Sequence, residues 1–161
     1  MAKSIHPAKI IFDLNGRLFL NALEGVTEMQ AKERLSDHNN PLNWLAAHSV
    51  WARHNACMFL GKPAAKNPYL GMFENFKPFD PAFAYPALAE IKAEWQNATA
   101  LLQEGLASVS EEHLAAESPV KNPTGDFTNG GTIAFLAQHE SYTIGQIAFL
   151  KKYLTKEAMK Y

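Results

Sequence analysis

The sequence lacks most of the features that would mark a specialised class of protein. It contains a single cysteine, Cys57, so no disulfide can form within the chain. Folding therefore does not depend on oxidation, and we expect a cytoplasmic protein. No apolar run approaches the roughly 20 residues that a membrane-spanning helix needs, and residues 1–7 lack the apolar core of a secretory signal. We therefore expect a soluble chain with no membrane partner.

An excess of charge of one sign is also missing. The formal net charge is −1, and lysine and arginine are spread along the chain instead of gathering in one stripe. We expect no nucleic-acid partner, because the basic surface that would neutralise phosphates is absent. The chain has 161 residues, of which 47% are hydrophobic and 19% charged. These ordinary globular values predict a single domain, residues 1–161.

Strand patterns are scarce as well, since alternation is absent and β-branched residues are sparse. The expected fold class is therefore all-α. Apolar residues recur at helical spacing in four segments, which we predict as the main helices: residues 11–23, 41–59, 86–106 and 132–154. Four helices with two long connections predict a four-helix bundle.

Several single positions within these helices carry expectations of their own. In the first helix, Ile11, Leu14, Leu18 and Ala22 recur at three- and four-residue steps and predict the inward face. Phe12, Phe19 and Leu23 widen this apolar stripe. In the last helix, Gly145 interrupts a strong helical pattern at a cost of about 1 kcal/mol. Such a glycine predicts the close approach of a neighbouring helix.

Residues 62–81 are predicted to form a long loop that is rich in proline and aromatic residues. Its aromatic members are Tyr69, Phe73, Phe76 and Phe79. A connection of that length in a compact domain is usually functional or mobile. The loop either forms a pocket wall or caps the core, and the sequence favours neither interpretation.

Two histidines lie on helix faces that are otherwise apolar. His48 lies between Trp44 and Trp51, and His139 lies between Leu136 and Thr143. A single histidine in such a place is more often a satisfied core residue than a ligand. Two on the inward faces of different helices indicate a site, because facing helices of a bundle assemble metal and cofactor sites.

Two segments around these histidines resemble a known family. Residues 40–48 read NPLNWLAAH, and residues 136–147 read LAQHESYTIGQI. They resemble the second-helix and last-helix signatures of the DinB-like proteins (the DinB/YfiT superfamily). The order of elements, including a Thr-Glu turn and a Ser-Glu-Glu turn, agrees over nearly the whole chain.

The resemblance implies a four-helix bundle of the DinB/YfiT type that is commonly a homodimer. It also implies a divalent metal, zinc or nickel, held by one histidine of the second helix and two of the last. Characterised members of the family include thiol-dependent transferases, hydrolases and isomerases that act on small molecules. A small-molecule ligand or substrate is therefore the partner that the resemblance implies.

Carried over position by position, the metal ligands fall on His48, His139 and Thr143. The third position departs from the family pattern, which has histidine there. Residues four apart on a helix lie only about 40° apart around its axis, so the position is suitable. A threonine hydroxyl, however, is a poor substitute for imidazole on zinc or nickel.

No other residue is an obvious replacement for the missing histidine. Glu140 is about 100° from His139 around the helix and points elsewhere, while Gln146 is too far along the axis. His54 lies about 120° off the face of His48, which predicts an exposed side chain. His113 lies in a short turn and has no predicted place.

Three interpretations therefore stand open. In the first, the chain is a metal-site protein, with or without enzymatic activity, in which His48 and His139 bind a divalent ion while Thr143 and water fill the remaining positions. Alternatively, it is a bundle without a metal that binds a small molecule or serves a structural role. In the third, the family likeness is misleading and the histidines are incidental. No further interpretation is indicated, because the sequence has no phosphate-binding glycine loop, Gly-x-Ser-x-Gly elbow or His-Glu-x-x-His motif. Cys57 is predicted to be a buried apolar residue rather than a nucleophile.

Overall fold

The computed structural model describes residues 2–62 and 67–161 of the chain. In these residues there are helices and one isolated bridge, between Glu117 and Thr128, but no strand. The elements are α1 (His6–Leu23), α2 (Glu28–Lys32), α3 (Leu42–Phe59), α4 (Leu70–Phe73), η1 (Glu74–Phe76), α5 (Leu88–Ser108), α6 (Glu111–Ala115) and α7 (Asn129–Thr155). None of the helices described is both long and apolar enough to cross a membrane.

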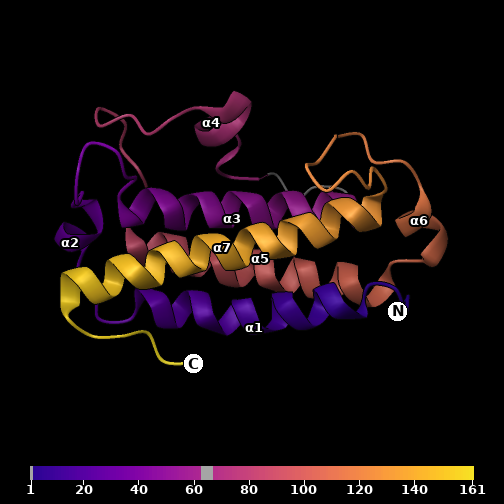
Figure 1. Ribbon diagram of the computed structural model, residues 1–161, viewed down its shortest axis with the longest axis horizontal. Coiled ribbons are helices and arrows are strands. Elements are labelled where there is room, and N and C mark those ends of the chain that lie inside the picture. Colours follow the sequence, from indigo (N-terminus) through magenta and orange to yellow (C-terminus); the bar gives the residue numbers. More distant parts are fainter. Residues whose placement is uncertain (1, 63–66) are drawn as a thin grey trace.

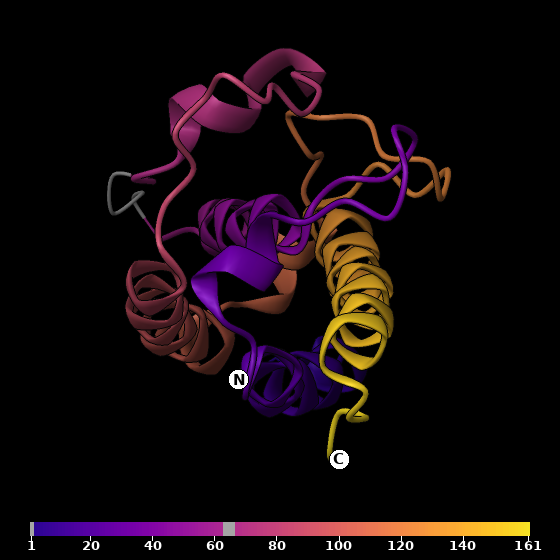
Figure 2. The same cartoon turned by 90° about the vertical axis from the view of Figure 1, so that its left-hand side faces the viewer.

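The long helices α1, α3, α5 and α7 form a four-helix bundle, which confirms the predicted all-α class (Figure 1). Seen end-on, they follow the order α1, α7, α3, α5 around the bundle (Figure 2). Helices α1 and α7 run in one direction, and α3 and α5 run in the other. Because α3 and α5 are parallel, the chain must return along the bundle between them, and α4 and η1 lie on that return path above α3.

The helix ends differ from the predicted ones by a few residues, and local caps explain the differences. The pair Asn40-Pro41 predicts an N-cap at Asn40, but the cap residue of α3 is Pro41, which makes no side-chain hydrogen bond, so that prediction is wrong. Helix α7 begins at Asn129, three residues earlier than expected, because the Thr128 hydroxyl accepts a hydrogen bond from the Gly131 amide. The sequence Thr27-Glu28-Met29-Gln30 predicts a capping box, and that box forms between Thr27 and Gln30.

The inward face of α1 is only partly the predicted one. Leu18 and Ala22 are buried, but Ile11 and Leu14 are each 37% exposed. Phe12 and Phe19, which widen the predicted stripe, are fully buried. The centre of the inward face therefore lies on their side of the helix, where the larger aromatic area is buried. Phe19 stacks on Trp95 of α5 with ring centroids 3.9 Å apart.

Two further single-residue expectations have opposite outcomes. Cys57 is buried, and burial raises the pKa of its thiol to about 11, as expected for an unreactive core residue. Gly145 is exposed, and a Cβ atom added there would meet nothing within 4 Å. The expected close approach of another helix at Gly145 is therefore wrong.

Candidate functional site

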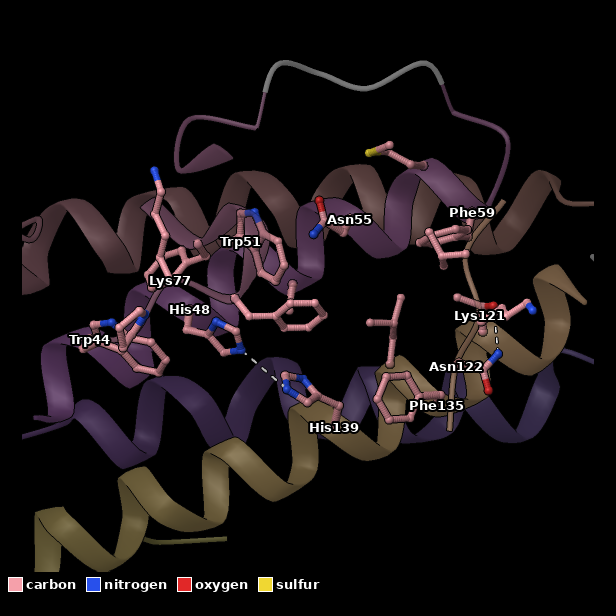
Figure 3. Close-up of a pocket in the computed structure, with 18 of the residues that line it drawn as sticks. Trp44, His48, Trp51, Asn55, Phe59, Lys77, Lys121, Asn122, Phe135 and His139 are labelled. Carbon is pink, nitrogen blue, oxygen red and sulfur yellow. Dashed lines mark hydrogen bonds between the residues drawn. The ribbon is translucent and has the colours of Figure 1, made fainter. Parts of the chain in front are cut away.

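The two histidines singled out in the sequence meet across the bundle. His48 projects from α3 and His139 from α7, and their Nε2 atoms lie 3.4 Å apart (Figure 3). The ring centroids are 5.3 Å apart with an interplanar angle of 68°. This distance allows a hydrogen bond in which one imidazole donates and the other accepts.

Aromatic side chains enclose the ring of His48. Trp44 and Trp51, four residues before and three after it on α3, stack against it at centroid distances of 5.1 and 5.3 Å. Phe73 of α4 meets the same ring edge-on at 5.2 Å. The spacing of the two tryptophans places them on one side of α3 with His48, so the helix itself builds this stack.

Both imidazoles are neutral near pH 7. Burial, with a smaller contribution from His139, lowers the pKa of His48 to about 4. Burial also lowers the pKa of His139. In a neutral pair joined through Nε2, one ring carries its proton on Nε2 and the other on Nδ1. The remaining donor and the remaining acceptor are then the two Nδ1 atoms, which are buried and have no partner among the described residues.

The histidine pair lies in the wall of a cavity of about 780 Å³. Helices α3 and α7, residues 73–79 and residues 120–122 supply most of the wall (Figure 3). Its aromatic members, besides the histidines, are Trp44, Trp51, Phe59, Phe73, Phe76, Phe79 and Phe135. A cavity of this size and lining is typical of small-molecule sites.

The long segment after α3 serves both of the roles that the sequence left open. Tyr69 and Phe73 are 2% and 3% exposed and belong to the core. Phe76 is fully exposed and Phe79 is half-buried, and both line the cavity. Phe73 lines it as well, so the same short stretch caps the core and closes one side of the cavity.

Thr143, the third position carried over from the family pattern, does not face the cavity. Its side chain is 3% exposed, and its hydroxyl donates a hydrogen bond to the carbonyl of His139 on its own helix, at 3.0 Å. Serine and threonine inside helices often satisfy their hydroxyl in this way. Thr143 is therefore engaged elsewhere.

The other residues considered as replacements also have partners away from the pair. Glu140 points elsewhere, as expected, and contacts Arg53. His54 is 4% exposed and its Nε2 lies 2.8 Å from Glu94 of α5, so the expectation that it is exposed is wrong. The ring of His113 lies 2.9 Å from the carbonyl of Phe59 at the end of α3.

The donor set can be tested against the geometry that a metal requires. Two nitrogens bound to one tetrahedral zinc ion lie about 3.3 Å apart, close to the 3.4 Å observed. A metal-bound imidazole almost always donates its other N–H to an acceptor, yet neither Nδ1 atom has a partner among the described residues. Those residues also contain no group of three or more histidine, cysteine, aspartate or glutamate side chains placed to hold a metal. The residues present do not fit a tightly held three-ligand metal.

Sequence reasoning missed one buried cluster close to the histidines. Arg53 of α3 and Glu140 of α7 form a two-bonded ion pair, with distances of 2.9 and 2.6 Å. The side chains are 0% and 2% exposed. The available signal was an arginine four residues after the buried Ser49, on a face otherwise made of small and apolar residues.

The comparisons with known proteins agree with this architecture. The family model of the DinB superfamily matches residues 11–147, so the chain belongs to that superfamily. A solved structure of a conserved protein from Enterococcus faecalis superposes with a TM-score of 0.72 and 14% sequence identity. The likeness covers 98% of this chain and 99% of that one, and at this identity it shows the fold alone. No curated protein matches the chain.

Proposed function

We propose that this DinB superfamily protein binds a small molecule in the cavity beside His48 and His139 and does not retain the tight metal site expected of its family. One observation carries the proposal. The two imidazoles face the cavity, whereas the Thr143 hydroxyl is bonded to the backbone of its own helix. The polar group presented to a ligand is then a neutral histidine pair in an aromatic wall.

The chemistry of such a pair supports binding without a metal. The two imidazoles already bond to each other through Nε2, so the pair is a neutral polar group that needs no ion to hold it together. Apolar contacts with the surrounding rings supply most of the affinity, and the histidines fix orientation. A neutral imidazole is also a competent general base, so a catalytic role would need no additional group.

A second function is favoured by the separation of the two Nε2 atoms. The 3.4 Å distance suits two ligands of a zinc or nickel ion, with water or substrate completing the coordination. Such an ion would lower the pKa of a bound thiol or water, which is the chemistry of a metal-dependent transferase or hydrolase.

The homodimer and the cytoplasmic location expected from the sequence remain predictions. Size-exclusion chromatography with light scattering would test the homodimer.

Metal content decides between the two functions. The protein is purified without a histidine tag, and zinc and nickel per chain are measured by mass spectrometry for wild type, His48→Ala and Thr143→His. Circular dichroism confirms that each variant is folded. On the proposed function, the wild type holds far less than one metal ion per chain. Thr143→His gains metal, because a third imidazole four residues after His139 completes the ligand set.

The opposite result would be equally informative. Near-stoichiometric metal in the wild type that is lost in His48→Ala would overturn the proposal and establish the metal-dependent alternative. A wild type without metal and a Thr143→His variant that also stays empty would show that the two histidines do not form part of any metal site. That result would leave binding by the neutral pair as the function to test.

A further inference from the structure

The charges in the cavity wall are all of one sign. Among the described residues that line it, Lys77 and Lys121 carry the only formal charges, and none is an aspartate or glutamate. From this we infer that the ligand is an apolar, ring-containing molecule that bears one anionic group, such as an aromatic carboxylate. The inference rests on the proposed function, because it names the class of molecule that the cavity takes.

The apolar part of the ligand follows from the rest of the wall. Its non-aromatic apolar members are Ala52, Met58, Pro78, Val120 and Leu136, which add to seven phenylalanine and tryptophan side chains. Burial of apolar area is the main source of affinity in such a site. A highly charged ligand such as a polyphosphate would leave several charges facing this wall without partners.

The anionic part follows from the two lysines, which lie at opposite ends of the cavity (Figure 3). Lys77 follows η1, and its Nζ donates a hydrogen bond to the Gly71 carbonyl at 2.9 Å, which ties it to α4. Lys121 precedes α7, with its Nζ 5.9 Å from the ring centroid of Phe127. Both side chains reach solvent, and each end of the cavity carries one of them.

The nearest buried acid does not offset these charges. The carboxylate of Glu140 lies one residue from His139 in the sequence but is already bonded to the Arg53 guanidinium. The formal charges of the described wall are therefore those of the two lysines, and they favour an anion.

A cationic ligand is the main competitor, since aromatic walls also bind ammonium groups through ring faces. Here the indole rings of Trp44 and Trp51 each turn a face toward the His48 ring, at 5.1 and 5.3 Å. Those faces are occupied by another side chain. Together with the repulsion from Lys77 and Lys121, this disfavours a cation.

The experiment first measures whether the cavity binds an apolar molecule and then measures which charge on the ligand it prefers. N-phenyl-1-naphthylamine, a neutral dye, first reports whether the cavity binds an apolar molecule, by its fluorescence in wild type and in Leu136→Trp, which places a larger side chain in the cavity wall. Weaker dye binding in Leu136→Trp is expected. Absence of dye binding in the wild type, or equal binding in both, would contradict the proposed function itself.

The charge preference is then measured by competition against the bound dye. The competitors share one ring system: 1-naphthylacetate, 1-naphthylacetamide and 1-naphthylethylamine. At low ionic strength the anion should bind roughly fivefold tighter than the neutral amide, and the cation more weakly than both. Added salt should reduce the difference, because the lysines are exposed.

Matched variants assign the preference to the lysines. Lys77→Gln with Lys121→Gln should bring the anion and the amide to equal affinity, each measured by competition against the dye affinity of that same variant. Lys152→Gln, an exposed lysine of α7 outside the cavity wall, is the control and should keep the full preference. If the dye binds but the amide or the cation matches the anion in wild type, or if the double variant keeps the preference, the inference is wrong and the proposed function still stands.

Discussion

Helices α3 and α7 are joined by two polar contacts that differ in almost every respect. One is the ion pair of Arg53 and Glu140, and the other is the pair of His48 and His139. Glu140 follows His139 directly in the sequence, yet the two side chains point to different sides of α7. The same helix pair thus carries one fully buried contact and one that borders a cavity.

The ion pair is satisfied on every side. The guanidinium of Arg53 also donates to the Thr99 hydroxyl at 2.6 Å and to the carbonyl of Phe12 at 3.2 Å. It lies 3.6 Å above the ring of Trp95. Burial raises the pKa of the Glu140 carboxyl, and the contact with Arg53 opposes that rise. A buried charge network of this kind stabilises one arrangement of the helices only while all its partners are present.

The histidine pair is satisfied on one side only. The two rings share a single contact through Nε2, and both Nδ1 atoms lack partners among the described residues. Buried polar groups without partners cost stability, so a fold that keeps them at a cavity wall has a reason other than stability. The comparison teaches that complete hydrogen bonding marks the structural contact and that incomplete hydrogen bonding marks the candidate functional one.

The largest predicted effect on stability comes from breaking the buried ion pair of Arg53 and Glu140. Glu140→Ala should lower the free energy of unfolding by roughly 3–5 kcal/mol, because it leaves the Arg53 charge buried without its partner. His139→Ala should cost only about 1 kcal/mol, since one hydrogen bond is lost beside an open cavity. Urea denaturation followed by circular dichroism measures both. Equal losses in the two variants would show that the histidine pair is a structural contact as well.

A smaller effect should appear as a dependence on pH. The pKa of His48 is lowered from 6.5 to about 4 in the folded chain, so the unfolded chain binds more protons between these values. Stability should therefore fall as the pH falls from about 6.5 to about 4, by about 2 kcal/mol once partial exposure is allowed for.

His48→Phe is the matched variant for this experiment. It keeps an aromatic ring between the two tryptophans and removes the titrating group. Urea denaturation of both proteins across the pH range gives the difference, in which the titration of groups outside the histidine pair cancels to first order. A wild-type curve that runs parallel to that of His48→Phe would mean that His48 is not held neutral by the fold.

The bundle and the histidine pair were predictable from sequence because both depend on local spacing. Helical periodicity located the four long helices, and the two signature segments placed His48 and His139 on facing helices. Helix ends were less predictable, since the Thr128 cap is a single side-chain hydrogen bond that competes with other start signals.

The surroundings of the pair depend on tertiary packing, which spacing does not encode. His54 was assigned to solvent because it lies off the face of His48, but α3 packs against α5 on that side and has no fully exposed face there. The direction of the Thr143 hydroxyl depends on its side-chain rotamer, which sequence spacing does not specify, and the observed rotamer bonds to the carbonyl of His139. Arg53 was missed because a buried arginine is recognised only together with its partners.

The smallest predicted effect concerns the side of α7 that faces neither contact. Gly145 has no atom within 4 Å of an added Cβ, and its backbone is helical. Gly145→Ala should therefore stabilise the protein by about 0.5–1 kcal/mol, because alanine loses less backbone entropy on folding. The same substitution at Gly131, also in α7, is the control. A Cβ there would lie 2.5 Å from the carbonyl oxygen of Asp126, so Gly131→Ala should destabilise the chain. If Gly145→Ala were destabilising in urea denaturation, a partner covering this side of α7 in solution would be indicated, and the helix would then have a third occupied face.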